Sequence, residues 1–335
     1  MKLSAQPHLA LLALSTHATS SPVTNYHEYD SNKDLLVKTP TFAVQGTVWP
    51  NNSAVHFYGN IPSAEPPIDT LRFRPPVTKA PSSDIINGSW FGPSCIQYNN
   101  WPAYCVLGEQ SEDCLTLNVW APKDVKAGDD LPVLIWIHGG GHTSGGAASP
   151  YKYGDRLARD QNVIVVAMNY RVNIFGFPGA AALDGRNLNP GLLDQSKAVE
   201  WTYANIDAFG GNPEQMILFG QSAGGSSVDL YSYAYPFDPL VKGFIAQSGV
   251  ASNGIVPTGS NFTYIASQLN CSSSTNTSIT SPDAELSCMQ SLPATSIISI
   301  YNTYNSTLKP NSRRPPNSTK FHLSSRRCRR GKTLF

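Results

Sequence analysis

The segment from Phe209 to Gly224 constrains this chain more than any other part of its sequence. It reads FGGNPEQMILFGQSAG, in which an apolar, strand-like run leads into the pattern Gly-x-Ser-x-Gly and then into small, helix-compatible residues. A strand that turns this sharply into a helix strains the serine backbone and exposes its hydroxyl. Small residues at Gly220, Ala223 and Gly224 allow neighbouring chain to pass close by. The pattern makes Ser222 a candidate nucleophile, although Gly-x-Ser-x-Gly also occurs by chance in ordinary turns.

A second strand-like segment, residues 131–137, ends in a run of three glycines. Its sequence LPVLIWI is short and apolar enough for a buried strand, and HGGGH follows it directly. Glycines let backbone N–H groups approach a ligand without a side-chain clash. Acyl transfer needs such donors because negative charge gathers on the carbonyl oxygen, and the loss of one donor costs about 10²–10³ in rate. Taken alone, the run is equally compatible with an ordinary glycine-rich turn.

The two segments resemble the signatures of type-B carboxylesterases, lipases and cholinesterases, and the resemblance extends from about Thr41 to the region of Cys271 and Cys288. It implies an α/β-hydrolase fold with a mostly parallel central sheet, helices on both faces and an incomplete C-terminus. It also implies a carboxylic ester hydrolase that works through a serine acyl-enzyme and needs no metal or cofactor. The further matching segments are Phe57–Pro67, Leu71–Phe73, Glu112–Val119, Asn169–Arg171, Phe175–Phe177, Asn189–Gln195 and Gln247–Gly249.

The resemblance also assigns roles to individual residues. It implies that Ser222 attacks the ester carbonyl, while the backbone N–H groups of Gly140, Gly141 and Ala223 hold the resulting oxyanion. His138 is expected to orient the glycine loop rather than to carry protons, because the family's catalytic histidine follows the serine.

The acid and the histidine of the catalytic triad are expected to be absent. The family's triad runs in the order Ser, Asp or Glu, His, and the only histidine after Ser222 is His322, which lies in a tail unlike the family. None of the acidic residues after Ser222 stands in the family's context for the triad acid. The chain as written is therefore predicted to be incomplete, poorly soluble and nearly inactive. These acidic residues are Asp229, Asp238, Asp283 and Glu285.

The predicted secondary structure agrees with this fold. Apolar and β-branched runs predict strands, and apolar residues at helical spacing predict a helix at 192–208. Strands that alternate with helices imply a largely parallel sheet covered on both faces, with active residues at the carboxyl ends of its strands. The predicted strands are 42–49, 115–120, 131–137, 163–169, 216–219 and 244–247.

The N-terminus and the sequons indicate a secreted protein. Residues 1–18 are predicted to be a signal peptide, because Met1-Lys2 precedes the apolar run LALLAL and a cleavage site near Ala18. A buried N-terminal helix is the alternative. The partial hydrolase domain then covers residues 22–308, and no later apolar run approaches the ~20 residues of a membrane span. Candidate glycosylation sites are Asn51, Asn87, Asn261, Asn270, Asn276, Asn305 and Asn317.

The six cysteines suit an oxidising compartment, where disulfides persist. By the family pattern, Cys95 pairs with Cys114 and Cys271 pairs with Cys288. Cys105 lies between the first two and competes for that pairing. A metal site has little support, because the chain contains no C-x-x-C motif and no histidine cluster.

The tail at 309–335 differs abruptly from the rest of the chain. Residues 313–335 carry eight Lys or Arg and no acidic residue, whereas the whole chain has a net charge of only +1. Four explanations compete: electrostatic binding to nucleic acid or an anionic membrane, a processing site, a solvated disordered tail, and an out-of-frame end of the gene model. The last is favoured because the resemblance stops shortly before the tail. We therefore expect a small-molecule carboxylic ester or a lipid as the partner, and not nucleic acid.

The alternative function comes from another class, a non-catalytic, cholinesterase-like binding or adhesion protein. Such relatives keep the fold and lose members of the triad. The intact Ser222 and glycine loop argue against a long-standing loss of catalysis. An ester hydrolase is therefore the preferred interpretation.

Overall fold

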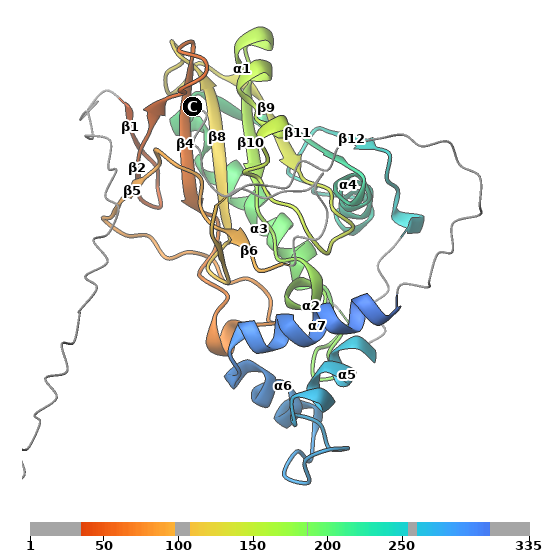
Figure 1. Cartoon of the computed structure of the whole chain (residues 1–335). Coiled ribbons are helices and arrows are strands. Elements are labelled where there is room, and N and C mark those ends of the chain that lie inside the picture. The colour runs from red at the N-terminus through yellow and green to blue at the C-terminus, as the bar shows by residue number, and fades with distance from the viewer. Residues whose placement is uncertain (1–34, 98–107, 186, 254–259, 309–335) are drawn as a thin grey trace, which may run out of the picture. The chain divides into compact units, whose positions relative to one another are not determined.

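A seven-stranded sheet forms the centre of the structure, a computed structural model that describes residues 35–97, 108–185, 187–253 and 260–308. The predicted parallel strands are present, and an antiparallel part that was not predicted extends the sheet. The parallel part consists, in spatial order, of β12 (Gly243–Gln247), β11 (Gly211–Gln221), β9 (Leu131–Ile137) and β10 (Ile164–Met168). The antiparallel part continues with β8 (Thr116–Pro122), β4 (Val55–Pro62) and β3 (Thr47–Val48) (Figure 1).

The helices that cover this sheet are α1 (Asp155–Gln161), α3 (Pro190–Asn205) and α4 (Ala223–Ala234). Successive side chains of a strand point to opposite faces of the sheet. On one face, Val166 of β10 belongs to a buried cluster with Val199 of α3 and Val228 of α4. On the other face, Val165 of β10 clusters with Ala158 of α1. The prediction of helices on both faces is confirmed.

Helix α3 lies where the helix at 192–208 was predicted, with both ends shifted by a few residues. It begins at Pro190, because proline already has a helical φ and lacks an N–H that the first turn would leave unpaired. After α3 the chain tightens into a 3₁₀ turn over Ile206–Phe209. Gly210, with φ 85°, then leads the chain into β11. This connection delivers the strand that carries Ser222.

A second hydrophobic cluster is built mainly from α2 (Asn173–Gly176), α5 (Ser260–Gln268), α6 (Pro282–Ser291) and α7 (Ala294–Leu308). Phe262, Leu286 and Ile297 from the last three helices pack there with Phe73 and with Phe175 of α2. None of these four helices was predicted from the sequence. Their apolar faces bury one another, so they hold together through packing between segments far apart in the sequence.

Arg72 connects the early part of the chain to the end of α6. Its guanidinium is paired with Glu112 at 2.7 Å, and its Nη1 donates to the carbonyls of Met289, Gln290 and Leu292 at 3.2, 2.9 and 2.6 Å. The last carbonyls of a helix have no partner within the helix. The buried arginine supplies the missing donors.

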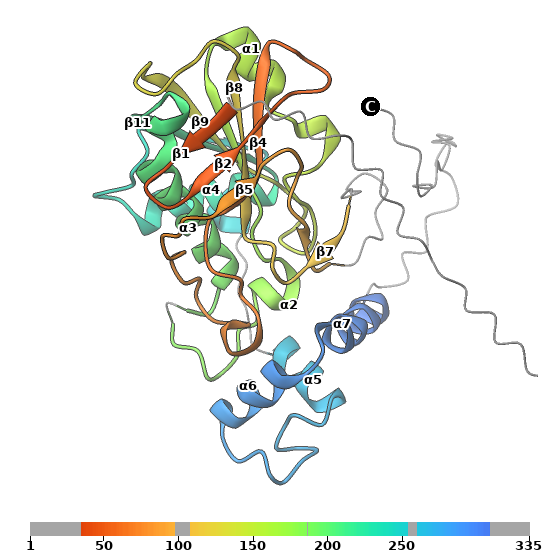
Figure 2. The ribbon, with the colours of Figure 1, turned by 90° about the vertical axis from the view of Figure 1, so that its left-hand side faces the viewer.

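Both predicted disulfides are present. Cys95–Cys114 and Cys271–Cys288 have Cα–Cα distances of 5.0 and 5.5 Å, within the usual range. Cys105 lies outside the described residues. The strand predicted at 42–49 is split between two sheets. Its first part forms a strand of a smaller sheet, whereas its second part forms β3 of the seven-stranded sheet. One smaller sheet contains β1 (Leu36–Lys38), β2 (Ala43–Gln45) and β5 (Ile85–Asn87), and the other contains β6 (Ser94–Cys95) and β7 (Gln110–Ser111) (Figure 1 and Figure 2).

The predicted signal peptide at 1–18 and the basic tail at 309–335 lie outside the described residues. Within the described ranges, no helix is long and apolar enough to cross a membrane. In the same part of the chain, no three His, Cys, Asp or Glu side chains gather as metal ligands do. Of the predicted glycosylation sites, Asn51, Asn261 and Asn270 are exposed, Asn87 and Asn276 are half-buried, Asn305 belongs to α7, and Asn317 is not described.

Candidate active site

Ser222 stands at the turn between β11 and α4. Its backbone has φ 57° and ψ −122°, a conformation that residues with a side chain rarely adopt. The turn is held from both sides, since Ser222 N donates to Gln247 O at 2.8 Å and Ser222 O accepts from Ser226 N at 2.9 Å. Ser222 is half-buried, so part of it faces solvent. This is the strained strand-to-helix turn that the motif requires.

Backbone contacts explain the small residues around Ser222. A Cβ atom at Gly224 would lie 2.1 Å from the carbonyl oxygen of Ile137, the last residue of β9. A Cβ atom at Gly249 would lie 2.0 Å from the carbonyl oxygen of Ser222. Neither position has room for a side chain. The turn is therefore enclosed by β9 on one side and by the segment after β12 on the other.

The glycine loop after β9 lies directly against Ser222. A Cβ atom at Gly139 would be 3.1 Å from Ser222 Cβ and 2.5 Å from the carbonyl oxygen of Gln221. Gly140 and Gly141 have φ angles of 126° and 62°, which favour glycine. The two segments meet because β9 and β11 are neighbouring parallel strands whose carboxyl ends share one edge of the sheet (Figure 1). The structure thus brings together the sequence-predicted loop and serine.

The amino end of α4 adds a favourable field at the same place. Ala223 is the first residue of this 12-residue helix and follows Ser222 directly. The first N–H groups of a helix have no partner within it, and the helix dipole favours negative charge there. Negative charge next to Ser222 is therefore favoured by the amino end of α4.

His138 lies beneath the glycine loop. Its ring is buried and stacks on Tyr170 at 4.2 Å, and its Nδ1 is 2.9 Å from the carbonyl oxygen of Gly139. Tyr170 donates its hydroxyl to the carbonyl oxygen of His138 at 2.9 Å. Burial lowers the pKa of His138 to about 3, so the imidazole is neutral near pH 7. A neutral ring in contact with the loop backbone suits the orienting role expected for it.

His142 is a site residue to which the sequence analysis assigned no role. Its Nε2 lies 2.9 Å from the hydroxyl of Ser227 on α4, and both residues are buried. Burial lowers the pKa of His142 to about 4. The only signal in the sequence was its place directly after the three glycines, which gives no indication of a partner 85 residues away.

The structure does not supply an acid–histidine pair for Ser222 from the residues that follow it and are described. His322 lies outside these residues. Asp229 is used structurally, since its carboxylate accepts a hydrogen bond from Ala251 N at 2.7 Å. Asp283 and Glu285 belong to the first turn of α6. The prediction that no triad acid stands among these residues remains a prediction.

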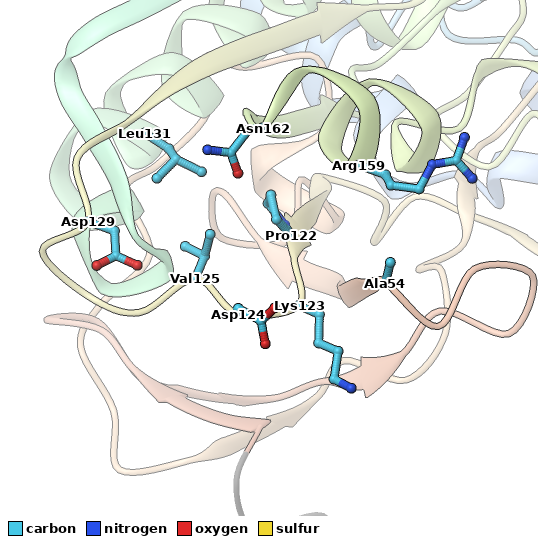
Figure 3. A pocket seen from close by; sticks show the side chains of 9 residues that line it. All are labelled: Ala54, Pro122, Lys123, Asp124, Val125, Asp129, Leu131, Arg159 and Asn162. Carbon is cyan, nitrogen blue, oxygen red and sulfur yellow. The ribbon is translucent and has the colours of Figure 1, made fainter.

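A cavity of about 450 Å³ lies at the opposite ends of the parallel strands from Ser222 (Figure 3). Its wall includes Leu131, where β9 begins, and Asn162, which precedes β10. Ligands of open α/β sheets bind beyond the carboxyl ends of the strands, so this cavity is not the candidate active site. A smaller cavity, of about 180 Å³, lies between α3 and α4 and has Ser227 and Gln195 in its wall.

The sequence matches the model of the carboxylesterase family over residues 33–321, and the chain belongs to that family. It is 42% identical over 304 residues to a chlorogenic acid esterase from Aspergillus niger, covering 85% of this chain and 56% of that protein. It is 39% identical over 264 residues to secreted lipase 5 from Gibberella zeae, covering 70% of this chain and 48% of that protein.

A solved structure of a thermophilic pNB esterase matches the fold with a TM-score of 0.67 and 31% sequence identity. The match covers 82% of this chain and 55% of that one, and it agrees with the α/β-hydrolase fold predicted from the sequence. This chain spans about half the length of these relatives.

Proposed function

We propose that the protein hydrolyses carboxylic esters through a covalent acyl-enzyme on Ser222. The observation that carries this proposal is the strained Ser222 backbone set directly against the glycine loop. Strain of this kind persists where the surroundings enforce it, chiefly at functional sites. It favours an enzyme over the non-catalytic binding protein considered as the alternative.

The reaction follows from the groups around Ser222. The Ser222 oxygen bonds to the ester carbonyl carbon and the carbonyl oxygen becomes an oxyanion. The Ser222 proton passes to the triad histidine that the family places after the serine, which the described residues do not include. The backbone N–H groups of Gly140, Gly141 and Ala223 hold that oxyanion. Its collapse expels the alcohol, which takes up the proton. Water then attacks the acyl-enzyme in the same way, releases the acid and restores Ser222.

The proposed substrate is a small carboxylic ester or a lipid ester. The relatives include proteins named as an esterase and as a secreted lipase. The Cys95–Cys114 loop closes over only 19 positions of sequence, which favours an open esterase site over a lidded lipase. We also propose secretion, which the two disulfides support because such bonds persist in oxidising compartments.

The test is covalent labelling of this chain with a fluorophosphonate probe, followed by mass spectrometry. Labelling measures the reactivity of the Ser222 hydroxyl and does not require the hydrolysis of an ester substrate. We expect a slowly formed adduct at Ser222, because the oxyanion hole retains part of the reactivity when the triad base is missing. Ser222→Ala should give none, and Ser287→Ala, which alters an exposed serine of α6, should leave the adduct unchanged. Labelling of a different serine, or undiminished labelling of Ser222→Ala, would refute the proposal.

A further inference from the structure

We propose that His142 is a positioning residue that ties the glycine loop to the nucleophile helix α4 through Ser227. This inference rests on the proposed function, because it concerns the placement of the oxyanion donors. Gly140 and Gly141 belong to the loop, whereas Ala223 begins α4. Three donors from two separate segments can hold one oxygen only if the segments keep a fixed distance.

The hydrogen bond between His142 and Ser227 joins these segments directly. His142 Nε2 lies 2.9 Å from Ser227 Oγ, and the residues are 5% and 1% exposed. Ser227 lies on the helix that Ser222 precedes, so a shift of the loop relative to α4 would break the contact. A buried hydroxyl that loses its hydrogen-bond partner is destabilising, because it is then satisfied neither by protein nor by water. The bond therefore resists movement between the two donor segments.

The backbone and ring of His142 are themselves held in place. Its φ of 55° lies in the left-handed region, which a residue with a side chain occupies only when its surroundings enforce it. Its carbonyl oxygen accepts a hydrogen bond from Asn173 N at 2.7 Å. Its ring lies 5.1 Å from the ring of Phe177 in an edge-on contact. These contacts direct the imidazole from the loop toward α4.

A cavity borders α4 on the side where Ser227 lies. The cavity of about 180 Å³ between α3 and α4 has Ser227, Leu230 and Tyr231 in its wall. Among the described residues, the buried side-chain nitrogen of Gln195 in the same wall has no hydrogen-bond partner. Close-packed neighbours resist displacement, whereas a void gives up those contacts. Next to the void, the bond to His142 is a specific restraint on this part of α4.

The protonation state of the imidazole suits this role. With a pKa lowered to about 4 by burial, His142 is neutral near pH 7 and offers one donor and one acceptor nitrogen. The Ser227 hydroxyl can donate or accept, so the bond forms with either tautomer. The His142 Nε2 atom is occupied by its hydrogen bond to Ser227. His142 therefore affects the oxyanion donors through the position of the loop backbone.

The test compares Ser227→Ala, which removes the hydroxyl, with Ser227→Thr, which keeps it, in the whole chain. The readout is the rate constant of fluorophosphonate labelling at Ser222. We expect Ser227→Ala to slow labelling about 10-fold, less than the ~10²–10³ cost of losing a donor, and Ser227→Thr to restore it to within about 3-fold. Ser196→Ala is the matched control, because Ser196 lines the same cavity from α3.

A double-mutant cycle separates positioning from general damage. If His142 and Ser227 act as one unit, His142→Phe combined with Ser227→Ala should be no slower than His142→Phe alone. Effects that multiply, or labelling of Ser227→Ala at the parent rate, would overturn the inference.

Hydrogen exchange of the amides at 138–145 gives a readout that needs no reactive serine. Ser227→Ala should exchange faster there than the parent, at equal global stability, and Ser196→Ala should not. If the parent chain fails to label, the proposed function is rejected while exchange still decides the role of His142. Unchanged exchange in Ser227→Ala would reject that role even if Ser222 is reactive.

Discussion

The inner strand β10 and the edge strand β12 differ in burial although both are short and largely apolar. All five residues of β10 are buried between β9 and β8, with helices on both faces. β12 has one strand neighbour among the described residues, β11, and four of its five residues are exposed. Burial here is decided by neighbours rather than by composition. Hydrophobic stabilisation is therefore concentrated on the β10 side of the sheet.

The candidate active site lies between these two regions. β11, which carries Ser222, pairs with the buried β9 on one side and with the exposed β12 on the other. On one face, Trp136 of β9 and Phe219 of β11 are half-buried with ring centroids 4.8 Å apart. The Ser222 turn is fixed chiefly by close backbone contacts with Ile137 and Gly249. Its geometry thus depends less on bulk burial than the inner strands do.

The largest effect should come from truncation of a core side chain on the inner side. Trp120 of β8 is 0% exposed and contacts Trp49 and Phe57, whereas Ile245 of β12 is 44% exposed. We expect Trp120→Ala to lower the free energy of unfolding by about 3–5 kcal/mol. Ile245→Ala should lower it by less than about 1 kcal/mol. Urea titrations followed by circular dichroism measure both free energies. Equal losses would show that the inner strands contribute no more to stability than β12 does.

The second largest effect should come from acid. Low pH should reduce the free energy of unfolding through the two buried imidazoles that follow β9. Burial lowers the pKa of His138 to about 3 and that of His142 to about 4, from 6.5. The unfolded chain therefore binds more protons, so stability is full above pH 6.5 and declines as pH falls toward 4. Denaturation midpoints measured from pH 7 to pH 4 should fall, and less steeply in His142→Asn.

A matched pair of glycine substitutions, one at the Ser222 turn and one in β12, should change stability by an intermediate amount. A Cβ atom at Gly224 would meet the carbonyl oxygen of Ile137 at 2.1 Å, whereas one at Gly243 of β12 would meet only Ile217 Cγ1 at 3.8 Å. Gly224→Ala should cost about 1–3 kcal/mol through overpacking and slow the labelling of Ser222. Gly243→Ala should leave both quantities nearly unchanged. Comparable losses for the two variants would show that the turn is no tighter than the edge.

The smallest effect on stability should come from a charge on the edge strand. Edge strands with exposed apolar side chains template aggregation, and lysine suppresses such pairing. We expect Ile245→Lys to change the free energy of unfolding by less than about 0.5 kcal/mol while it lowers light scattering at high concentration. Unchanged scattering would show that this chain does not aggregate through β12.

Local patterns in the sequence predicted what depends on neighbouring residues. The strand at 131–137 was found at Leu131–Ile137, because its apolar run and the glycines after it define both ends. β11 begins at Gly211, whereas the predicted strand begins at 216. The added first part of β11 contains a register shift between Gly211 and Met216 in its pairing with β9. Periodicity carries no signal for such an irregularity.

Contacts between distant segments escaped the sequence analysis. Ser222 and the glycine loop were predicted because their motif residues need special backbone geometry. The contact between His142 and Ser227 was not predicted, because no local pattern pairs a histidine with a residue 85 positions later. The antiparallel pairing of β8 with β10 was missed for the same reason. Strand order is set by which faces bury one another, and this is a property of the whole chain.

The contact between Arg72 and the end of α6 has a consequence for how the protein is made. Arg72 leaves the ribosome 220 residues before Leu292, whose carbonyl it binds. At about 5–20 residues per second, that interval lasts roughly ten to forty-five seconds. Glu112, which pairs with Arg72 in the folded protein, is made only 40 residues after it. The partner that balances the charge of Arg72 is thus made long before the helix-end carbonyls that Arg72 binds.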